Sequence, residues 1–152
     1  MADKDHIAKL IELGDDLASL KHAQEIAAQA LKAAGEPPFP KNGCAATLSA
    51  LLKLAGIDVP MTLGAGKLAH ILGGQISSRG WAHIPVGEQQ PGDVGVTFDF
   101  GGVPGADHVY LVLHTVTTDH MIIADNQAPE PHLRYASGKG GKTPTDYFLR
   151  AS

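Results

Sequence analysis

Residues 42–56 read Asn-Gly-Cys-Ala-Ala-Thr-Leu-Ser-Ala-Leu-Leu-Lys-Leu-Ala-Gly, a short loop followed by an apolar, alanine-rich stretch. This stretch predicts a helix that begins at Cys44 and ends near Gly56 and Pro60. Cys44 is the only cysteine of the chain. A thiol at a helix N-terminus meets free backbone N–H groups and the positive end of the helix dipole, and both favour the nucleophilic thiolate. By position alone, a small buried core residue is an equally good interpretation.

The sequence after residue 90 alternates apolar runs with turns, which predicts an antiparallel arrangement of strands. The expected strands cover residues 94–98, 108–114 and 121–124. His108 begins the second strand, and Asp125-Asn126-Gln127 follows the third. If the chain turns near Thr118, His108 lies opposite residues 126–128, and side chains two apart share a face. Cysteine on a helix, histidine on a strand and a polar group on the next strand form a cysteine–histidine hydrolase constellation.

The order and local wording of these motifs resemble the papain-like NlpC/p60 and CHAP (cysteine, histidine-dependent amidohydrolase/peptidase) superfamily of cell-wall hydrolases. Residues 44–56 are similar to the family phrase Cys-Ala-Ala-x-Val-Ser-x-x-Leu-x-x-Ala-Gly. A Pro-Gly-Asp-Val strand, a Gly-His-Val strand and a Gly-Asn-Gln-like phrase follow in those families. The corresponding stretches here are 91–94, 107–109 and 125–127. The resemblance covers roughly residues 40–150, and its strength lies in four motifs in the correct order.

Two positions depart from the family pattern. Gly43 stands where those families often have Asp, Trp or Gln, and Asp107 replaces the glycine before the histidine. These departures bear on substrate preference and the oxyanion hole more than on the fold.

The resemblance implies an α+β, papain-like NlpC/p60 fold. N-terminal helices and a helix that starts at the cysteine would pack on a small antiparallel sheet. The expected organisation is a single cysteine hydrolase domain over residues 1–152. Residues 1–38 would form an N-terminal helical segment and residues 39–152 the catalytic core.

The resemblance also implies roles for individual residues. Cys44 would be the nucleophile and His108 its base and later the acid. For the third residue, which orients the imidazole, the first choice is Asn126, because it matches the Asn of the family phrase. Asp125 is second by its charge, and Gln127 is third.

The oxyanion would be held by the backbone N–H of Cys44, with Asn42 as a second donor. By resemblance, the substrate is a peptide or the amide link between glycan and peptide in peptidoglycan. No metal or organic cofactor is implied. A delivery or immunity protein is the partner expected for such an enzyme.

Two other classes of function remain open from the residues. One is a non-catalytic binding or structural domain on the same fold. The other keeps the cysteine chemistry but directs it to transglutaminase-like acyl transfer or deamidation.

Composition and charge limit the classes of protein and partner further. Of the 152 residues, 43% are hydrophobic and 18% charged, which is typical of a globular domain. A net charge of −4 without a Lys/Arg-rich run argues against a nucleic-acid partner. No stretch reaches transmembrane length, so no membrane insertion is expected. The first residues lack the apolar core of a signal peptide. We therefore expect synthesis in the cytoplasm and export by a dedicated secretion machine or a phage route.

The rest of the chain predicts helices before the central strands. It also predicts one extended segment before these strands in the sequence and one strand after them. Helices are expected at 5–13, 15–34 and 66–72, a strand or loop at 81–85, and a strand at 146–150. Asp15 and Asp16 mark the start of the second helix and Gly35 its end.

The chain has eight histidines but no HExxH pattern. Apart from His108, they are expected to be polar residues of the surface or of strand edges. His114 and His120 flank the hairpin turn, yet two histidines without a third ligand make a weak metal site. Asp93 is expected to act in the turn at a strand entrance, not in catalysis.

Overall fold

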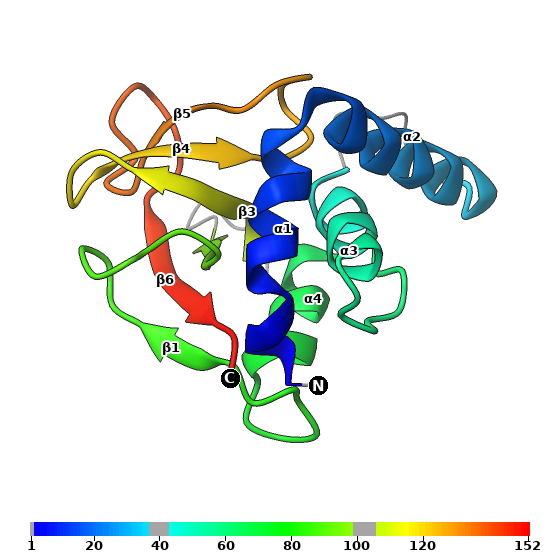
Figure 1. Cartoon of the computed structure of the whole chain (residues 1–152), viewed down its shortest axis with the longest axis horizontal. Coiled ribbons are helices and arrows are strands. Elements are labelled where there is room, and N and C mark those ends of the chain that lie inside the picture. Colours follow the sequence, from blue (N-terminus) through cyan, green and yellow to red (C-terminus); the bar gives the residue numbers. More distant parts are fainter. Residues whose placement is uncertain (1, 37–42, 99–105) are drawn as a thin grey trace.

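The computed structural model describes residues 2–36, 43–98 and 106–152, and its described part is an α+β fold (Figure 1). A 3-10 turn, Asp3–His6, precedes the first helix. The helices are α1 (Ile7–Asp15), α2 (Leu17–Ala33), α3 (Cys44–Leu54) and α4 (Ala65–Gly73). The strands are β1 (Ala82–Ile84), β2 (Val94–Phe98), β3 (Ala106–Thr115), β4 (His120–Ala124), β5 (His132–Tyr135) and β6 (Thr145–Arg150).

The predicted helices are confirmed with small shifts at their ends. α1 begins two residues later than expected because the chain first makes the 3-10 turn. α2 begins directly after Asp16, whose carboxylate accepts a hydrogen bond of 3.0 Å from the backbone N–H of Ser19. This cap satisfies one of the free N–H groups of the first turn and fixes where the helix starts.

The strands form one antiparallel sheet in the order β1-β6-β2-β3-β4-β5. β5 is the strand that the sequence did not predict. It is four residues long and follows Pro129 and Pro131, which are rare inside strands. β5 forms because it pairs with β4 at the edge of the sheet, where Ile123 lies opposite His132.

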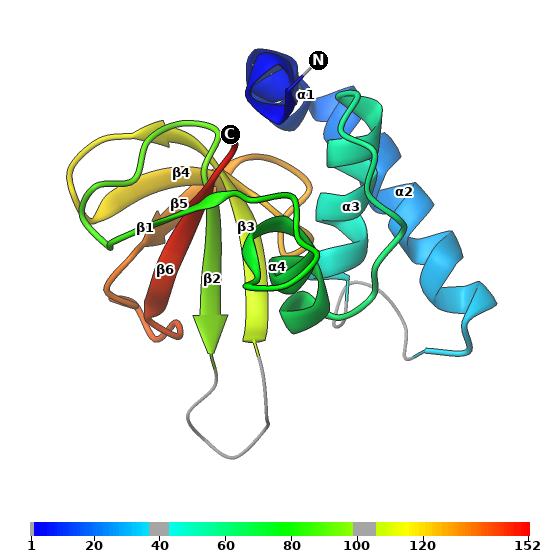
Figure 2. The same ribbon diagram turned by 90° about the horizontal axis from the view of Figure 1, so that it is seen from below.

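The two faces of the sheet carry different cores. Val109, Leu111 and Leu113 of β3 belong to the larger core, which also contains apolar residues of α1, α2, α3 and α4. Tyr110 and Val112, on the alternate positions, belong to a smaller cluster on the opposite face. Figure 2 shows the helices gathered on one side of the sheet, with α3 and α4 beside β3. The helical layer thus packs mainly against β3.

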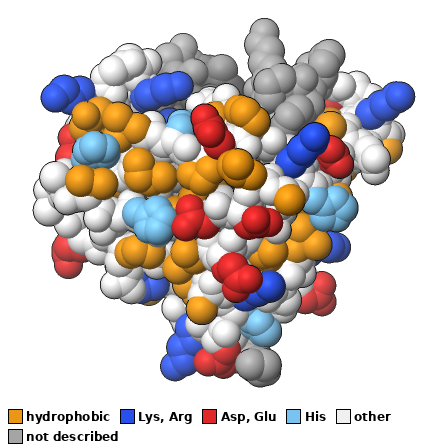
Figure 3. Space-filling model, turned by 45° about the horizontal axis from the view of Figure 1, so that its top comes forward, with side chains coloured by type: hydrophobic (Ala, Val, Ile, Leu, Met, Phe, Trp, Pro, Cys, Tyr) orange, Lys and Arg blue, Asp and Glu red, His pale blue; other side chains and the backbone are white. Residues whose placement is uncertain are grey.

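Over the described residues, no helix is both long enough and apolar enough to cross a membrane. On the face shown in Figure 3, Lys and Arg side chains lie scattered among acidic side chains and histidines. Hydrophobic side chains run between them in a broken band.

Candidate active site

Cys44 is the first residue of α3 and is 9% exposed. Gly43 precedes it as the N-cap and has no side chain that could bond the first-turn amides. The Gly43 carbonyl accepts the first helical hydrogen bond, 2.8 Å from the N–H of Thr47. The N–H groups of the first helical residues, Cys44 among them, have no partner within the helix. Asn42, the expected second oxyanion donor, lies outside the described residues.

His108 stands near the start of β3 and is buried. Its Nε2 lies 2.8 Å from Oδ2 of Asp125, and the side chain of Cys44 lies close enough to the ring to raise its pKa. A carboxylate can only accept, so Nε2 carries the hydrogen of the bond to Asp125. Nδ1 is therefore the ring nitrogen left for Cys44. The structure thus brings together three residues from α3, β3 and the end of β4.

The surroundings of His108 favour its charged form. Burial alone would lower the pKa of His108, but the hydrogen bonds to Asp125 and Cys44 and the charges of both residues raise it to about 9. The pKa of Asp125 lies well below its ordinary value, because its bonds to His108 and His132 outweigh the cost of burying a carboxylate. At neutral pH the site therefore holds an imidazolium next to the sulfur of Cys44.

The bond to His108 comes from Asp125, the second choice for the orienting residue, whereas the family phrase had put Asn126 first. β4 ends at Ala124, which lies opposite Leu111 of β3. Asp125 is the next residue, so its carboxylate lies at the end of β4, beside the strand that carries His108.

Gln127, the third choice, contacts Asp125 through its backbone. Its backbone N–H donates to Oδ1 of Asp125 at 2.9 Å. Its side-chain oxygen accepts a hydrogen bond of 3.4 Å from Lys142. Gln127 therefore steadies the carboxylate through the backbone.

His132 is a member of the site that the sequence did not reveal. It begins β5, and its Nε2 lies 2.8 Å from Oδ1 of Asp125. Asp125 therefore joins two imidazoles, one on each carboxylate oxygen. The sequence did not point to His132 because β5 was not predicted, and a histidine directly after Pro131 is typical of a loop.

Tyr110 lies two residues after His108 on β3 and on the same face of the sheet, and it makes polar contacts of its own. The rings of His108 and Tyr110 are 6.2 Å apart, and the Tyr110 hydroxyl bonds Thr145 at 2.6 Å. The guanidinium of Arg134 lies 4.9 Å from the centre of the Tyr110 ring. Burial raises the pKa of Tyr110 to about 12, so this phenol stays neutral. It supports the site without competing as a base.

The histidines at the hairpin do not meet in a metal site. His114 pairs with Asp15 at 2.9 Å, and the ring of His120 packs against Tyr135. Within residues 2–36, 43–98 and 106–152, no three His, Cys, Asp or Glu side chains are placed to hold a metal ion.

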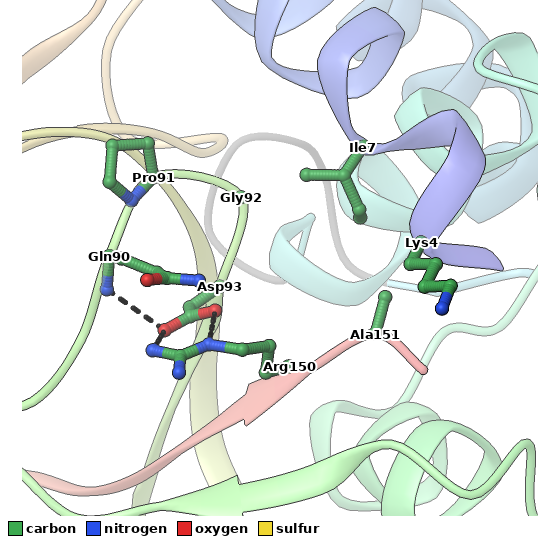
Figure 4. Close-up of a pocket in the computed structure, with 8 residues that line it drawn as sticks. All are labelled: Lys4, Ile7, Gln90, Pro91, Gly92, Asp93, Arg150 and Ala151. Atoms are coloured by element: carbon green, nitrogen blue, oxygen red, sulfur yellow. Dashed lines mark hydrogen bonds and ion pairs between the residues drawn. The ribbon is translucent and has the colours of Figure 1, made fainter.

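Asp93 has the structural role that the sequence predicted. It accepts from the N–H of Gln90 at 2.9 Å and is held by Arg150 through both carboxylate oxygens. Figure 4 shows this pair in a pocket between the N-terminal segment and β6. The pocket contains none of Cys44, His108 and Asp125.

Comparison with known proteins gives no matching family model, no similar curated protein and no similar solved structure.

Proposed function

We propose that this protein is a cysteine hydrolase that cleaves an amide bond through Cys44, His108 and Asp125. One observation carries the proposal: a cysteine at a helix N-terminus lies beside a buried histidine and raises its pKa, and a buried carboxylate fixes that histidine. A nucleophile, a base and an orienting group in this sequence of contacts are the parts that covalent acyl transfer requires.

The first half-reaction would form a thioester. The Cys44 thiolate attacks the amide carbonyl, and a new S–C bond forms. The backbone N–H of Cys44 stabilises the negative charge on the carbonyl oxygen. The His108 imidazolium gives its proton to the leaving nitrogen as the C–N bond breaks.

The second half-reaction would return the enzyme to its starting state. Neutral His108 takes a proton from water, and the resulting hydroxide equivalent attacks the thioester. The C–S bond breaks, and His108 and Cys44 regain the imidazolium–thiolate pair. Asp125 keeps the ring in the tautomer that presents Nδ1 to the sulfur throughout.

The substrate class we propose is the peptide or the glycan–peptide amide of peptidoglycan, on the strength of the resemblance to the papain-like NlpC/p60 and CHAP enzymes. The test is digestion of purified peptidoglycan followed by mass analysis of the released fragments. We expect soluble fragments with the wild-type protein, no fragments with Cys44→Ala and almost none with Cys44→Ser. Turnover by pure, folded Cys44→Ala would exclude Cys44 as the nucleophile.

The same digestion separates hydrolysis from the alternatives. With an added primary amine, a hydrolase releases free carboxylates, whereas an acyl transferase places the amine on the product. A binding domain leaves the peptidoglycan intact but sediments with it.

We further propose that the protein acts outside the cytoplasm after export by a secretion or phage route. Fusion to a periplasmic signal sequence should make the wild-type protein lytic, and Cys44→Ala should remove the lysis at equal soluble levels. Normal growth with well-folded exported wild-type protein would count against a cell-wall substrate.

A further inference from the structure

Gln24 of α2 reaches the turn that carries Asp125, although the two residues are 101 positions apart. Its side-chain nitrogen lies 2.9 Å from the backbone oxygen of Asp125 and 2.8 Å from that of Ala128. A primary amide has two N–H groups, so one group can serve each carbonyl. Gln24 is buried, as is Asp125. The amide therefore holds both ends of the four-residue turn 125–128.

This turn has little other support from the sheet. The β3–β4 pairing ends at Leu111 and Ala124, so the backbone after Ala124 leaves the ladder just where the site residue stands. Within the turn, the backbone N–H of Gln127 donates a hydrogen bond to the Asp125 carboxylate. On the carbonyl side, Gln24 supplies a donor to two backbone oxygens, and a buried carbonyl needs a donor.

We infer that Gln24 is a positioning residue of the Cys44–His108–Asp125 site, and this inference rests on the proposed function. Gln24 touches neither Cys44 nor His108 in the described contacts. It acts through Asp125: by fixing the backbone, it keeps the carboxylate against Nε2 of His108. The N-terminal helical segment is then part of the working site, although the resemblance to hydrolases begins only at about residue 40.

The test uses the only cysteine of the chain as its reporter, so no substrate is needed. The rate of Cys44 alkylation by iodoacetamide is measured by mass spectrometry from pH 5 to pH 10. Gln24→Met keeps the bulk of the side chain and removes both donors. A hydrogen bond to a charged or buried group is worth about a factor of ten in an equilibrium, so we expect about tenfold slower alkylation at pH 7. The pH at which the His108 proton is lost should fall by about one unit.

Gln29 provides the matched control, because it lies on α2 and is exposed. Gln29→Met should keep the wild-type profile. Gln24→Glu, which has nearly the same size and no amide donor, should show at least the loss of Gln24→Met. Circular dichroism establishes that each variant is folded.

Wild-type rates and profiles in folded Gln24→Met and Gln24→Glu would overturn the inference. So would failure of both variants to fold, because the two bonds would then serve the fold and not the site. A wild-type protein whose Cys44 reacts like a cysteine in the urea-unfolded chain is a different result. It would remove the proposed function, and this inference with it.

Discussion

Among single residues, Asp125 stands out because its carboxylate stays ionised although it is buried. It is buried and accepts N–H groups from His108, His132 and the backbone of Gln127. Three donors on one carboxylate explain why it stays ionised inside the protein. Its charge in turn stabilises the imidazolium of His108.

Asp125→Asn should therefore damage the site more than any change at Asn126. The amide keeps the size of the side chain but loses the charge, so the pKa of His108 should fall from about 9. We expect hydrolysis to fall at least about 100-fold, as for other losses of an orienting acid. Asn126→Ala should cost less, because it leaves the bond between Asp125 and His108 in place.

Steady-state hydrolysis by the two variants, at matched folding, checks this order. A larger loss in Asn126→Ala than in Asp125→Asn would return the orienting role to the residue that the family phrase favoured.

The sequence predicted part of this site at the residue scale. Cys44 and His108 followed from a helix start and a strand start. Asp125 was ranked second because a matched phrase was preferred over strand alternation, which needs a known register. His132 could not be found, because it begins the unpredicted strand β5, seven positions after its partner Asp125.

Among the elements, β2 and β3 make the closest approach next to the site. Gly95 of β2 lies opposite Tyr110 of β3, and a Cβ at Gly95 would overlap the Tyr110 ring. The ring is held by Thr145 through its hydroxyl and by Arg134 over its face, so it has no free direction in which to move. The lack of a side chain at position 95 thus allows Tyr110 to lie flat on β2.

Gly95→Ala should therefore destabilise the fold by about 2 kcal/mol or more, as for other overpacked sites. Gly64→Ala is the control, since a Cβ there meets its nearest neighbour, Lys67, at 3.7 Å. Urea unfolding of the two variants measures the difference. Equal free energies of unfolding would mean that Tyr110 can shift, and that it does not fix β3 beneath His108.

Most elements were predictable because their signals are local. The acidic cap at Asp16, the alanine-rich run after Cys44 and the alternating strands each carry their own pattern. The strand β5 was not predictable, since it forms by pairing with β4 and the prolines just before it argue for a loop.

For the whole molecule, the N-terminal segment is tied to distant parts of the chain. Asp3 binds Arg79 at 2.6 Å and accepts from the Trp81 indole at 2.9 Å. The N–H of Lys4 donates to the carbonyl of Ser152 at 3.2 Å, and both chain ends lie together in Figures 1 and 2. Leu10 and Leu20 are buried in the same core as residues of β3.

These contacts predict that the N-terminal helices and the sheet unfold together. Trp81 is the only tryptophan and is buried, so its fluorescence reports on the region joining α4 to the sheet. Its urea transition should coincide with the loss of helical circular dichroism. Two separate midpoints would show that the N-terminal segment is an independent unit, against its proposed role in holding Asp125.

The pH profile of Cys44 alkylation tests the central claim most directly, since its shape does not depend on how easily the reagent enters. With an imidazolium that persists to about pH 9 beside the sulfur, the wild-type rate should change in step with the loss of the His108 proton near that pH. His108→Ala should lack this step. A wild-type profile that matches His108→Ala and the urea-unfolded chain would contradict the account.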